Sequence, residues 1–251
     1  MKFTKNPKNL IYGRHPIQEA LDAGQEFDRI FIQSANKSES LKAIRQQATE
    51  MGINIQSVPI EKLKRLTNAN HQGVAGYLSL VQYYKVEDIL SLAYEKGELP
   101  LFIILDSVQD VRNFGAIVRS AQCFNVHGII IPSVGGAPIS GDAIKASAGA
   151  LATFPICKVD DLGEAVNYLK ENGLMIAVAA LSKSDFIYKV PFDQPMAIIM
   201  GAEGKGVSSH LTRLADIEVN IPHSGNFDSL NVSVASGIIL YEVTRQRKTS
   251  S

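Results

Sequence analysis

The stretch LFIILDSVQDVRNFGAIVRSA, residues 101–121, joins a short continuous apolar run to an amphipathic one. The apolar run at 101–106 predicts a buried strand, and GAIVRSAQCF at 115–124 predicts a helix. Short apolar strands that alternate with helices favour a parallel sheet covered on both faces, which is an α/β fold. The same pattern continues downstream, with predicted strands at 127–132, 175–181, 197–201 and 217–222, a predicted helix at 142–151 and a closing helix.

Upstream of this stretch, a smaller α/β unit is predicted. Residues 1–80 form this unit, residues 81–100 are a linker that contains a helix and stops at Pro100, and residues 101–251 form the larger domain. In the small unit, the patterns predict helices at 17–24 and 40–52, and strands at 28–33, 53–59 and 74–80.

Composition indicates a folded, soluble chain. Its 251 residues are 45% hydrophobic, no apolar run reaches membrane-spanning length, and MKFTKNPKNL lacks the apolar segment of a signal peptide, so we expect a cytoplasmic protein with no membrane partner. Cys123 and Cys157 have neither zinc nor redox spacing, and both are expected to be buried free thiols. No histidine has ligand spacing with another histidine or a cysteine, so no metal is expected.

Charge is unevenly distributed along the chain. Residues 1–80 hold 11 Lys and Arg against 7 Asp and Glu, whereas the remainder holds 14 against 18, although the formal net charge is zero. A basic excess is ordinarily a solvated surface, but it also suits a polyanionic partner such as RNA or DNA.

Three loops follow predicted strands and carry glycine together with polar residues. In parallel sheets, ligands bind beyond the carboxyl ends of the strands, which is where these loops lie. MGAEGKG, residues 200–206, permits close approach of backbone to a ligand, but it is equally compatible with a tight turn. NFGAIVRSA, residues 113–121, places Asn113 as a helix cap and Arg119 in the first or second turn, either as a solvated cation or as a phosphate ligand.

The third loop leads into DSLNVSVASGIILYE, residues 228–242. Alternation of Ser229, Asn231 and Ser233 would suit a strand, but the apolar residues that follow fall at helical spacing. We predict a helix from about 229–232 to about 246, capped by Ser229 or Asn231, whose small residues at 235–237 admit a close neighbour. The fragment alone leaves open whether the polar groups only cap the helix or also meet a ligand.

Taken in order, these three motifs resemble those of the SpoU family of RNA ribose 2′-O-methyltransferases. The likeness rests on NxGxxxR at 113–119, GxEGxG at 201–206 and IP followed by SLNVS at 221–233, and it covers essentially the whole chain. IYGRHPIQEAL and HQGVAGYL in residues 1–80 are similar to the branch that methylates guanosine of 23S rRNA. That front unit resembles a small RNA-binding domain of ribosomal proteins.

The resemblance implies a fold, a cofactor and residue roles. It implies S-adenosylmethionine as cofactor, a deep trefoil knot of the SPOUT type, and a homodimer whose interface includes the 235–237 face. It also implies that Gly201, Ile221 and Leu230 contribute backbone groups to the cofactor site. A branched side chain at Gly201 is expected to enter the ligand space and leave the fold intact. The implied catalytic set is Asn113, Arg119, Glu203, Ser229 and Asn231.

Two departures from the family pattern bear on these roles. Relatives often have Asp-Pro-His-Asn-Leu-Gly where this chain reads DVRNFG, and Met where His223 follows Ile221 and Pro222. The missing proline is expected to loosen a turn, and His223 is expected at a rim position without a catalytic role.

Alternatives of other classes stay open. One is a non-catalytic RNA-binding protein of the same fold, and within the family a tRNA methyltransferase is the rival. A dinucleotide enzyme would need its glycine loop after the first strand, whereas here the loop comes late in the domain.

Overall fold

The computed structural model describes residues 9–34, 36, 38–180, 185–224 and 229–249. The chain divides into two compact units, Met1–Leu80 and Val81–Ser251. Each unit has its own sheet and its own apolar core. No helix in the described part of the chain is long and apolar enough to cross a membrane.

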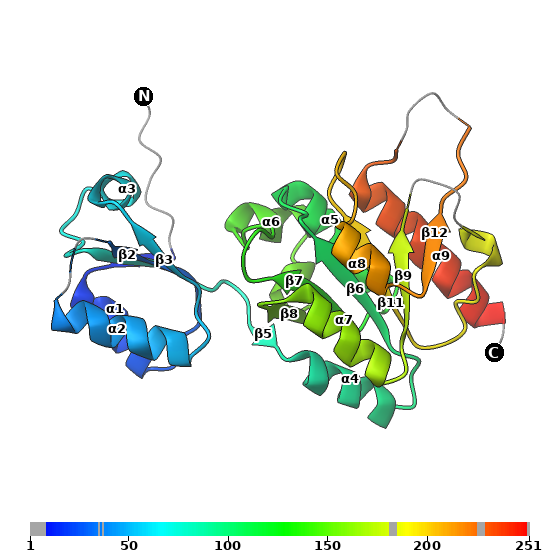
Figure 1. Cartoon of the computed structure of the whole chain (residues 1–251), viewed down its shortest axis with the longest axis horizontal. Coiled ribbons are helices and arrows are strands. Elements are labelled where there is room, and N and C mark those ends of the chain that lie inside the picture. Colours follow the sequence, from blue (N-terminus) through cyan, green and yellow to red (C-terminus); the bar gives the residue numbers. More distant parts are fainter. Residues whose placement is uncertain (1–8, 35, 37, 181–184, 225–228, 250–251) are drawn as a thin grey trace. The chain divides into compact units, whose positions relative to one another are not determined.

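The first unit is a four-stranded sheet with helices on both faces (Figure 1). Its elements are β1 (Leu10–Tyr12), α1 (Arg14–Asp22), β2 (Phe27–Gln33), α2 (Glu39–Glu50), β3 (Ile55–Val58), α3 (Ile60–Leu66) and β4 (Val74–Leu78). The strand order is β1-β4-β2-β3, and only β2 and β3 pair in parallel. Strand β2 is buried on both faces, because Ile30 and Ile32 pack with α1 and α2 whereas Phe31 packs with α3.

The predicted elements of this unit are confirmed, with boundaries shifted by a few residues. The sequence pattern does not predict β1 or α3, because elements of 3 and 7 residues are too short to display a clear period.

The second unit contains an eight-stranded sheet in which every neighbouring pair is parallel. The strands are β5 (Tyr83–Tyr84), β6 (Leu101–Asp106), β7 (Gly128–Pro132), β8 (Ile156–Val159), β9 (Met175–Ala179), β10 (Asp185–Phe186), β11 (Met196–Gly201) and β12 (Ile217–Asn220). Their order is β10-β12-β9-β11-β6-β7-β8-β5, so β6 and β11 lie at the centre of the sheet. The predicted parallel α/β sheet is therefore confirmed.

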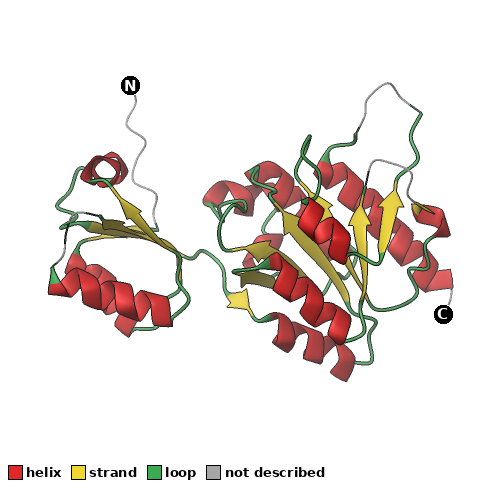
Figure 2. Ribbon diagram, viewed as in Figure 1, coloured by secondary structure: helices red, strands yellow, loops and turns green. Residues whose placement is uncertain are grey.

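Helices cover both faces of this sheet (Figure 2). They are α4 (Val86–Glu95), α5 (Val111–Cys123), α6 (Gly141–Ala146), α7 (Leu162–Glu171), α8 (Ser209–Leu214) and α9 (Val232–Thr249), with short 3₁₀ helices η1 (Ala150–Ala152) and η2 (Ile187–Lys189). Helices α4, α7 and α8 pack on one face, and α5, α6 and α9 pack on the other.

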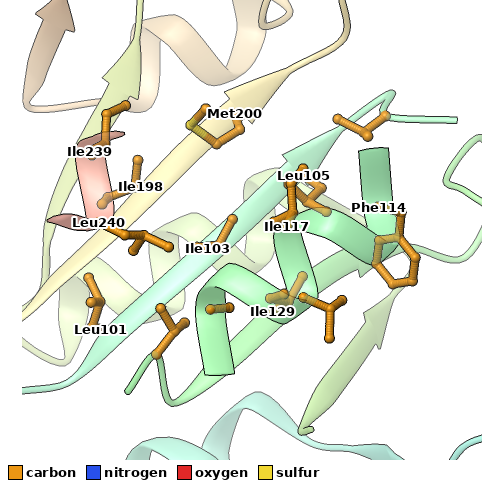
Figure 3. Close-up of a cluster of buried hydrophobic side chains, with 14 of the residues drawn as sticks. Leu101, Ile103, Leu105, Phe114, Ile117, Ile129, Ile198, Met200, Ile239 and Leu240 are labelled. Carbon is orange, nitrogen blue, oxygen red and sulfur yellow. The ribbon is translucent and has the colours of Figure 1, made fainter. Parts of the chain in front are cut away.

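Strand β6 shows why its sequence is continuously apolar. Leu101, Ile103 and Leu105 point toward α5 and α9, as Figure 3 shows, whereas Phe102 and Ile104 point toward α4 and α7. All six residues of the strand are buried. A strand buried on both faces loses the alternation that a half-exposed strand would display.

Several expectations need correction. Residues 81–100 are not a linker, because β5 and α4 belong to the second unit and Ile89 and Leu90 are buried in its core. The helix predicted at 142–151 ends after Ala146, and η1 follows it. The patterns did not predict β8, α7, α8 or β10. Leu181, the last residue of the strand predicted at 175–181, lies outside the described residues.

The two cysteines differ in environment. Cys157 is buried in β8, and burial raises the pKa of its thiol to about 12. Cys123 is exposed at the end of α5, contrary to expectation, because the apolar face of that helix is formed by residues such as Ile117 and Ala121.

Candidate active site

A pocket opens at the carboxyl ends of β9, β11 and β12, and we call it the strand-end pocket. The ends of the two neighbouring strands β9 and β11, the segment after β12 and the start of α9 form its wall. Gly201, Ile221 and Leu230 all line it, so the structure brings together the positions implied to hold a cofactor. The wall consists of Ala179, Ala180, Met200, Gly201, Ala202, Glu203, Gly204, Gly206, Val219, Asn220, Ile221, His223, Ser229, Leu230, Val232, Ala235 and Ile239.

The pocket is largely apolar, with polar groups from a few positions. Buried Met200, Val219 and Ile239 are part of its lining, and small residues such as Ala180 leave space. Glu203 and Ser229 are exposed residues of the same wall. Such a combination suits a ligand with a flat apolar body and a few polar groups.

The glycine loop after β11 folds back on itself. The Gly206 N–H donates to the Ala202 carbonyl oxygen at 2.8 Å, and Gly204 and Gly206 have φ of 77° and 66°, where glycine is favoured. A Cβ atom on Gly201 would lie 2.1 Å from the Gly206 carbonyl carbon. A side chain at Gly201 would therefore collide with the loop itself, so the expectation that a branched residue there spares the fold is wrong.

Asp106 anchors the end of this loop, although it was not among the site residues predicted from the sequence. Its Oδ2 accepts from the Ser208 N–H at 2.7 Å, and its Oδ1 accepts from the Ser107 hydroxyl at 3.0 Å. Asp106 is mostly buried and lies opposite Gly201 in the β6–β11 register. A carboxylate that ends an otherwise apolar buried strand was the feature that could have identified it.

The NxGxxxR motif at 113–119 lies at the start of α5, which has a side-chain cap. The Asp110 carboxylate accepts from the backbone N–H groups of Arg112 and Asn113 at 2.8 and 2.9 Å, and these bonds, led by that from Asn113, lower the pKa of Asp110. Asn113 is thus the third residue of α5 and not its cap, because the helix begins at Val111. Val111 occupies the first helical position, where relatives often have proline, and a cap is present without it.

Gly115 sets how closely α5 approaches α6. A Cβ atom there would lie 2.5 Å from the Ala146 Cβ and 2.8 Å from the Ala143 carbonyl oxygen. This glycine of the NxGxxxR motif therefore serves helix packing, which holds the N-terminus of α5 in place.

Asn113, Glu203 and Asn231 form one hydrogen-bonded cluster. Asn113 Nδ2 donates to Glu203 Oε1 at 2.9 Å, and Asn231 Nδ2 donates to Asn113 Oδ1 at 3.0 Å and also to Glu203 Oε1. Asn231 Oδ1 in turn accepts from the N–H groups of Ser233 and Val234, so Asn231 also caps α9 as predicted. One residue from each of the three sequence motifs meets here, beside the strand-end pocket that Glu203 lines.

Comparison with known proteins identifies the family. The model of the SpoU rRNA methylase family matches residues 100–241, and a model described as RNA 2′-O ribose methyltransferase substrate binding matches residues 10–84. The chain belongs to the SpoU methylase family. A Staphylococcus haemolyticus protein assigned to the TrmH family of tRNA/rRNA methyltransferases is 34% identical over 238 residues, which cover 95% of this chain and 96% of that protein.

Two solved structures share the SpoU fold. AviRb from Streptomyces viridochromogenes, a SpoU methyltransferase crystallised with AdoMet, superposes with a TM-score of 0.60 at 22% identity over 96% of this chain and 90% of that one. The TrmH/SpoU tRNA modifying enzyme of A. aeolicus superposes with a TM-score of 0.56 at 34% identity over 65% of this chain and 85% of that one. They confirm the predicted α/β fold, with a parallel-sheet domain preceded by a small domain.

Arg119 belongs to the implied catalytic set but lies outside both the strand-end pocket and the Asn113–Glu203–Asn231 cluster. It lies in the third turn of α5, later than predicted, and is exposed. It does not line the strand-end pocket, and within the described chain its guanidinium has no hydrogen bond or ion pair. A phosphate or hydroxyl group from outside the chain can therefore reach it.

His223 and Ser229 lie at the exposed margin of the strand-end pocket. His223 Nδ1 lies 3.0 Å from the Ile221 carbonyl oxygen, to which it can donate. This places His223 at a rim position, as expected. In the described residues, no group of three or more His, Cys, Asp or Glu side chains could hold a metal ion.

The exposed apolar side of α9 differs from the 235–237 face, which the resemblance implied for a dimer interface. Ser236 is only 2% exposed, and Ala235 lines the strand-end pocket. The exposed apolar residues of α9 are Val234 and Tyr241, which are 50% and 60% exposed and fall on one side of the helix at a spacing of two turns.

Proposed function

We propose that this protein transfers a methyl group from S-adenosylmethionine to the ribose 2′-hydroxyl of a guanosine in 23S rRNA. The observation that carries the proposal is the meeting of all three sequence motifs at one place. Glu203 lines the strand-end pocket and also bonds to Asn113 and Asn231, so a cofactor pocket and a polar cluster share a wall. Membership of the SpoU methylase family supports the same reaction class.

The residues of the strand-end pocket fit S-adenosylmethionine. Its apolar wall suits the adenine and the carbon chain, and the backbone at Gly201, Ile221 and Leu230 would supply polar groups to the adenosine and methionyl parts. When bound, the cofactor's sulfonium would supply an electrophilic methyl group. Because that group is already activated, the protein mainly needs to align the ribose oxygen and ease the loss of its proton.

The polar side chains then have separate tasks. The Asn113–Glu203–Asn231 cluster holds the start of α5, the glycine loop and the start of α9 in one arrangement. Arg119 would bind the 2′-hydroxyl and a neighbouring phosphate, because an exposed guanidinium offers a planar fork of donors. It would not act as an ordinary general base, since guanidinium stays protonated. Ser229, exposed on the pocket wall, would bind substrate or cofactor polar groups.

Ribosomal RNA is favoured as substrate because of the first unit. That unit matches a substrate-binding model of RNA 2′-O-ribose methyltransferases and carries the basic excess of the chain. The alternative is a tRNA ribose methyltransferase, since a TrmH/SpoU tRNA modifying enzyme is among the structural neighbours. A non-catalytic RNA-binding protein is disfavoured, because the complete polar cluster is retained beside the pocket.

A knotted homodimer is part of the proposal. The deep trefoil knot expected from the family would involve the segments at β11, β12 and α9, which together form the strand-end pocket. Val234 and Tyr241 give α9 an exposed apolar side suited to a two-fold interface. Light scattering should therefore report a dimer, and Tyr241→Glu should shift it toward monomer.

The test is methylation of defined RNAs by the purified protein. We expect label from S-adenosylmethionine in unmodified 23S rRNA, at a 2′-O-methylguanosine mapped by resistance to alkaline cleavage, and none in tRNA. Label in tRNA alone would support the alternative. Calorimetry should show binding of S-adenosylhomocysteine and no binding of NAD, and binding without methylation of either RNA would favour the non-catalytic protein.

Arg119→Ala separates the proposed role of this side chain from cofactor binding. Turnover should fall by roughly 100-fold or more, as for loss of a charged positioning group, with unchanged affinity for S-adenosylhomocysteine. Arg213→Ala is the matched control, since Arg213 is an exposed arginine of α8 outside the pocket. Equal turnover in the two variants would remove Arg119 from the site.

A further inference from the structure

A second concave site lies in the first unit, and we call it the amide groove. It forms where the loop before α1 meets the loop before β4, so it joins the two front-unit motifs IYGRHPIQEAL and HQGVAGYL. Five of its lining side chains are carboxamides, and its charged lining residues are Arg14 and Lys64. No described residue of its lining is acidic.

Specific backbone geometry builds this groove. The Gly13 N–H donates to the Val74 carbonyl oxygen at 3.1 Å, and the Arg14 N–H donates to Gln72 Oε1 at 3.1 Å. Arg14 Nε also donates to the Gln72 carbonyl oxygen at 3.1 Å. Gly73 has a φ of 87°, and a Cβ atom there would lie 3.2 Å from Asn36 Nδ2, so a side chain would be both strained and crowded.

His71 presents a ring nitrogen to the groove. Its side chain is only 8% exposed, and its Nδ1 accepts from the Gly73 N–H at 3.1 Å. In the neutral ring the proton is then on Nε2, which is a donor. No residue of the described chain accepts from that nitrogen, although His71 lines the groove. Ser38 Oγ is the only fully buried unpaired side-chain polar atom in the described residues, so His71 Nε2 is open to the groove and can donate to a ligand there.

The cations of the groove have no acidic partner among the described residues, although Arg14 also donates from Nη1 to Ser40 Oγ at 3.0 Å. Within the described residues, no carboxylate lies within ion-pair distance of Arg14 or Lys64, whereas Lys42 on α2 pairs with Glu39 at 2.6 Å. Asn68 and Asn70 are exposed beside them. The groove therefore offers positive charge next to groups that both donate and accept hydrogen bonds.

We propose that the amide groove binds an unpaired nucleotide of the substrate RNA, with Arg14 and Lys64 at the phosphate and Asn68, Asn70 and His71 at the base or ribose. This inference rests on the proposed RNA methyltransferase function and names the part of the first unit that reads the substrate. Carboxamides match the edges of bases, and the Watson–Crick edges are free only where the bases are unpaired. No Phe, Tyr or Trp is among the described residues of the groove, so recognition would depend mainly on hydrogen bonds.

Fluorescence anisotropy of the full-length protein with a short labelled single-stranded RNA tests the inference. Lys64→Ala should weaken binding about tenfold. It should also reduce the salt slope by about 0.7, the value for one phosphate contact on a single strand. Lys42→Ala removes the same charge from the same unit outside the groove, and it should change neither quantity. Equal effects of the two substitutions would overturn the groove as the binding site.

A second variant separates base contacts from phosphate contacts. Asn68→Ala combined with Asn70→Ala should weaken binding several-fold and leave the salt slope unchanged, because neither side chain is charged. The fully paired form of the same RNA should bind more weakly to the unaltered protein and should be insensitive to this double change. Equal loss on paired and unpaired RNA would contradict recognition of an unpaired nucleotide.

Failure of this inference differs from failure of the proposed function. If the protein methylates rRNA but the groove variants bind RNA as tightly as the unaltered protein does, only the groove assignment falls. If the protein neither binds S-adenosylhomocysteine nor methylates RNA, the methyltransferase proposal falls. Affinity for S-adenosylhomocysteine should be the same in all groove variants, because the strand-end pocket belongs to the second unit. An unchanged melting transition of the first unit confirms that the variants fold.

Discussion

The strand-end pocket and the amide groove differ in their lining and in the kind of ligand that each suits. The pocket has an apolar lining, and the polar cluster at its edge is satisfied internally, since Asn113, Glu203 and Asn231 bond to one another. The groove is lined by carboxamides and cations, several of which have no protein partner in the described chain. A small ligand of fixed shape needs a preorganised wall, whereas a charged polymer needs spare donors on an open surface.

Deletion of residues 1–80 should have the largest effect, because it removes the amide groove and leaves the strand-end pocket. Because all three motif loops belong to the second unit, the remainder should stay soluble and bind S-adenosylhomocysteine unchanged. Methylation of rRNA should fall by roughly 100-fold or more, and the salt dependence of RNA binding should become shallower, through loss of phosphate contacts. An unchanged rate and slope would mean that RNA recognition resides in the second unit.

Arg247→Met should destabilise the unit that carries the pocket. The guanidinium donates to the carbonyl oxygens of Leu99, Phe192 and Gln194 at 2.7 to 3.0 Å, and thereby holds the end of α9 against the segments that precede β6 and β11. Its loss would leave partly buried carbonyls without donors, at a cost of about 2–3 kcal/mol in the free energy of unfolding. Calorimetry should show a lower melting temperature for the second unit only, and Arg245→Met, at an exposed position on the same helix, should cost less.

Ala180→Leu tests whether this wall of the strand-end pocket binds the cofactor. Ala180 lines it, and a larger side chain would occupy space that the adenosine part needs. Affinity for S-adenosylhomocysteine should fall about tenfold, which corresponds to roughly 1.4 kcal/mol. Ala152→Leu, at an exposed position of η1, makes the same chemical change away from the pocket. RNA affinity measured without cofactor should be unaffected in both, and a normal cofactor affinity in Ala180→Leu would exclude this wall from the site.

The smallest expected effect is a pH dependence of the second unit. The hydrogen bond from Arg245 is the main cause that lowers the pKa of Glu242, and backbone donors lower that of Asp110. Both folded-state pKa values lie below the unfolded values of about 4, so the stabilisation is complete above that range and is lost as pH falls through the lowered values. Glu242→Gln should reduce the loss in melting temperature between pH 5 and about pH 3, and an unchanged profile would argue against this pair as a source of acid sensitivity.

Local sequence patterns determined most of the fold and the identity of the motifs. Strands such as 101–106 and 197–201 were predictable because a strand buried on both faces needs a continuous apolar run. The order of the three motifs indicated the SpoU family and selected Gly201, Ile221 and Leu230, which meet at one pocket. Asn231 as a helix cap was predictable because its partners are two and three residues away.

Tertiary structure alone decided which of these residues touch and which stand apart. Asn113 contacts Glu203 across 90 residues and Asn231 across 118 residues, and no local pattern encodes such pairs. The anchoring role of Asp106, the exposure of Cys123 and the separation of Arg119 from the pocket likewise follow from packing. The amide groove forms where two distant loops meet at Gly13 and Gly73, both of positive φ, so the donor that His71 presents there is not visible in the sequence. Local order depends on nearby residues, whereas a binding site depends on contacts that the whole fold creates.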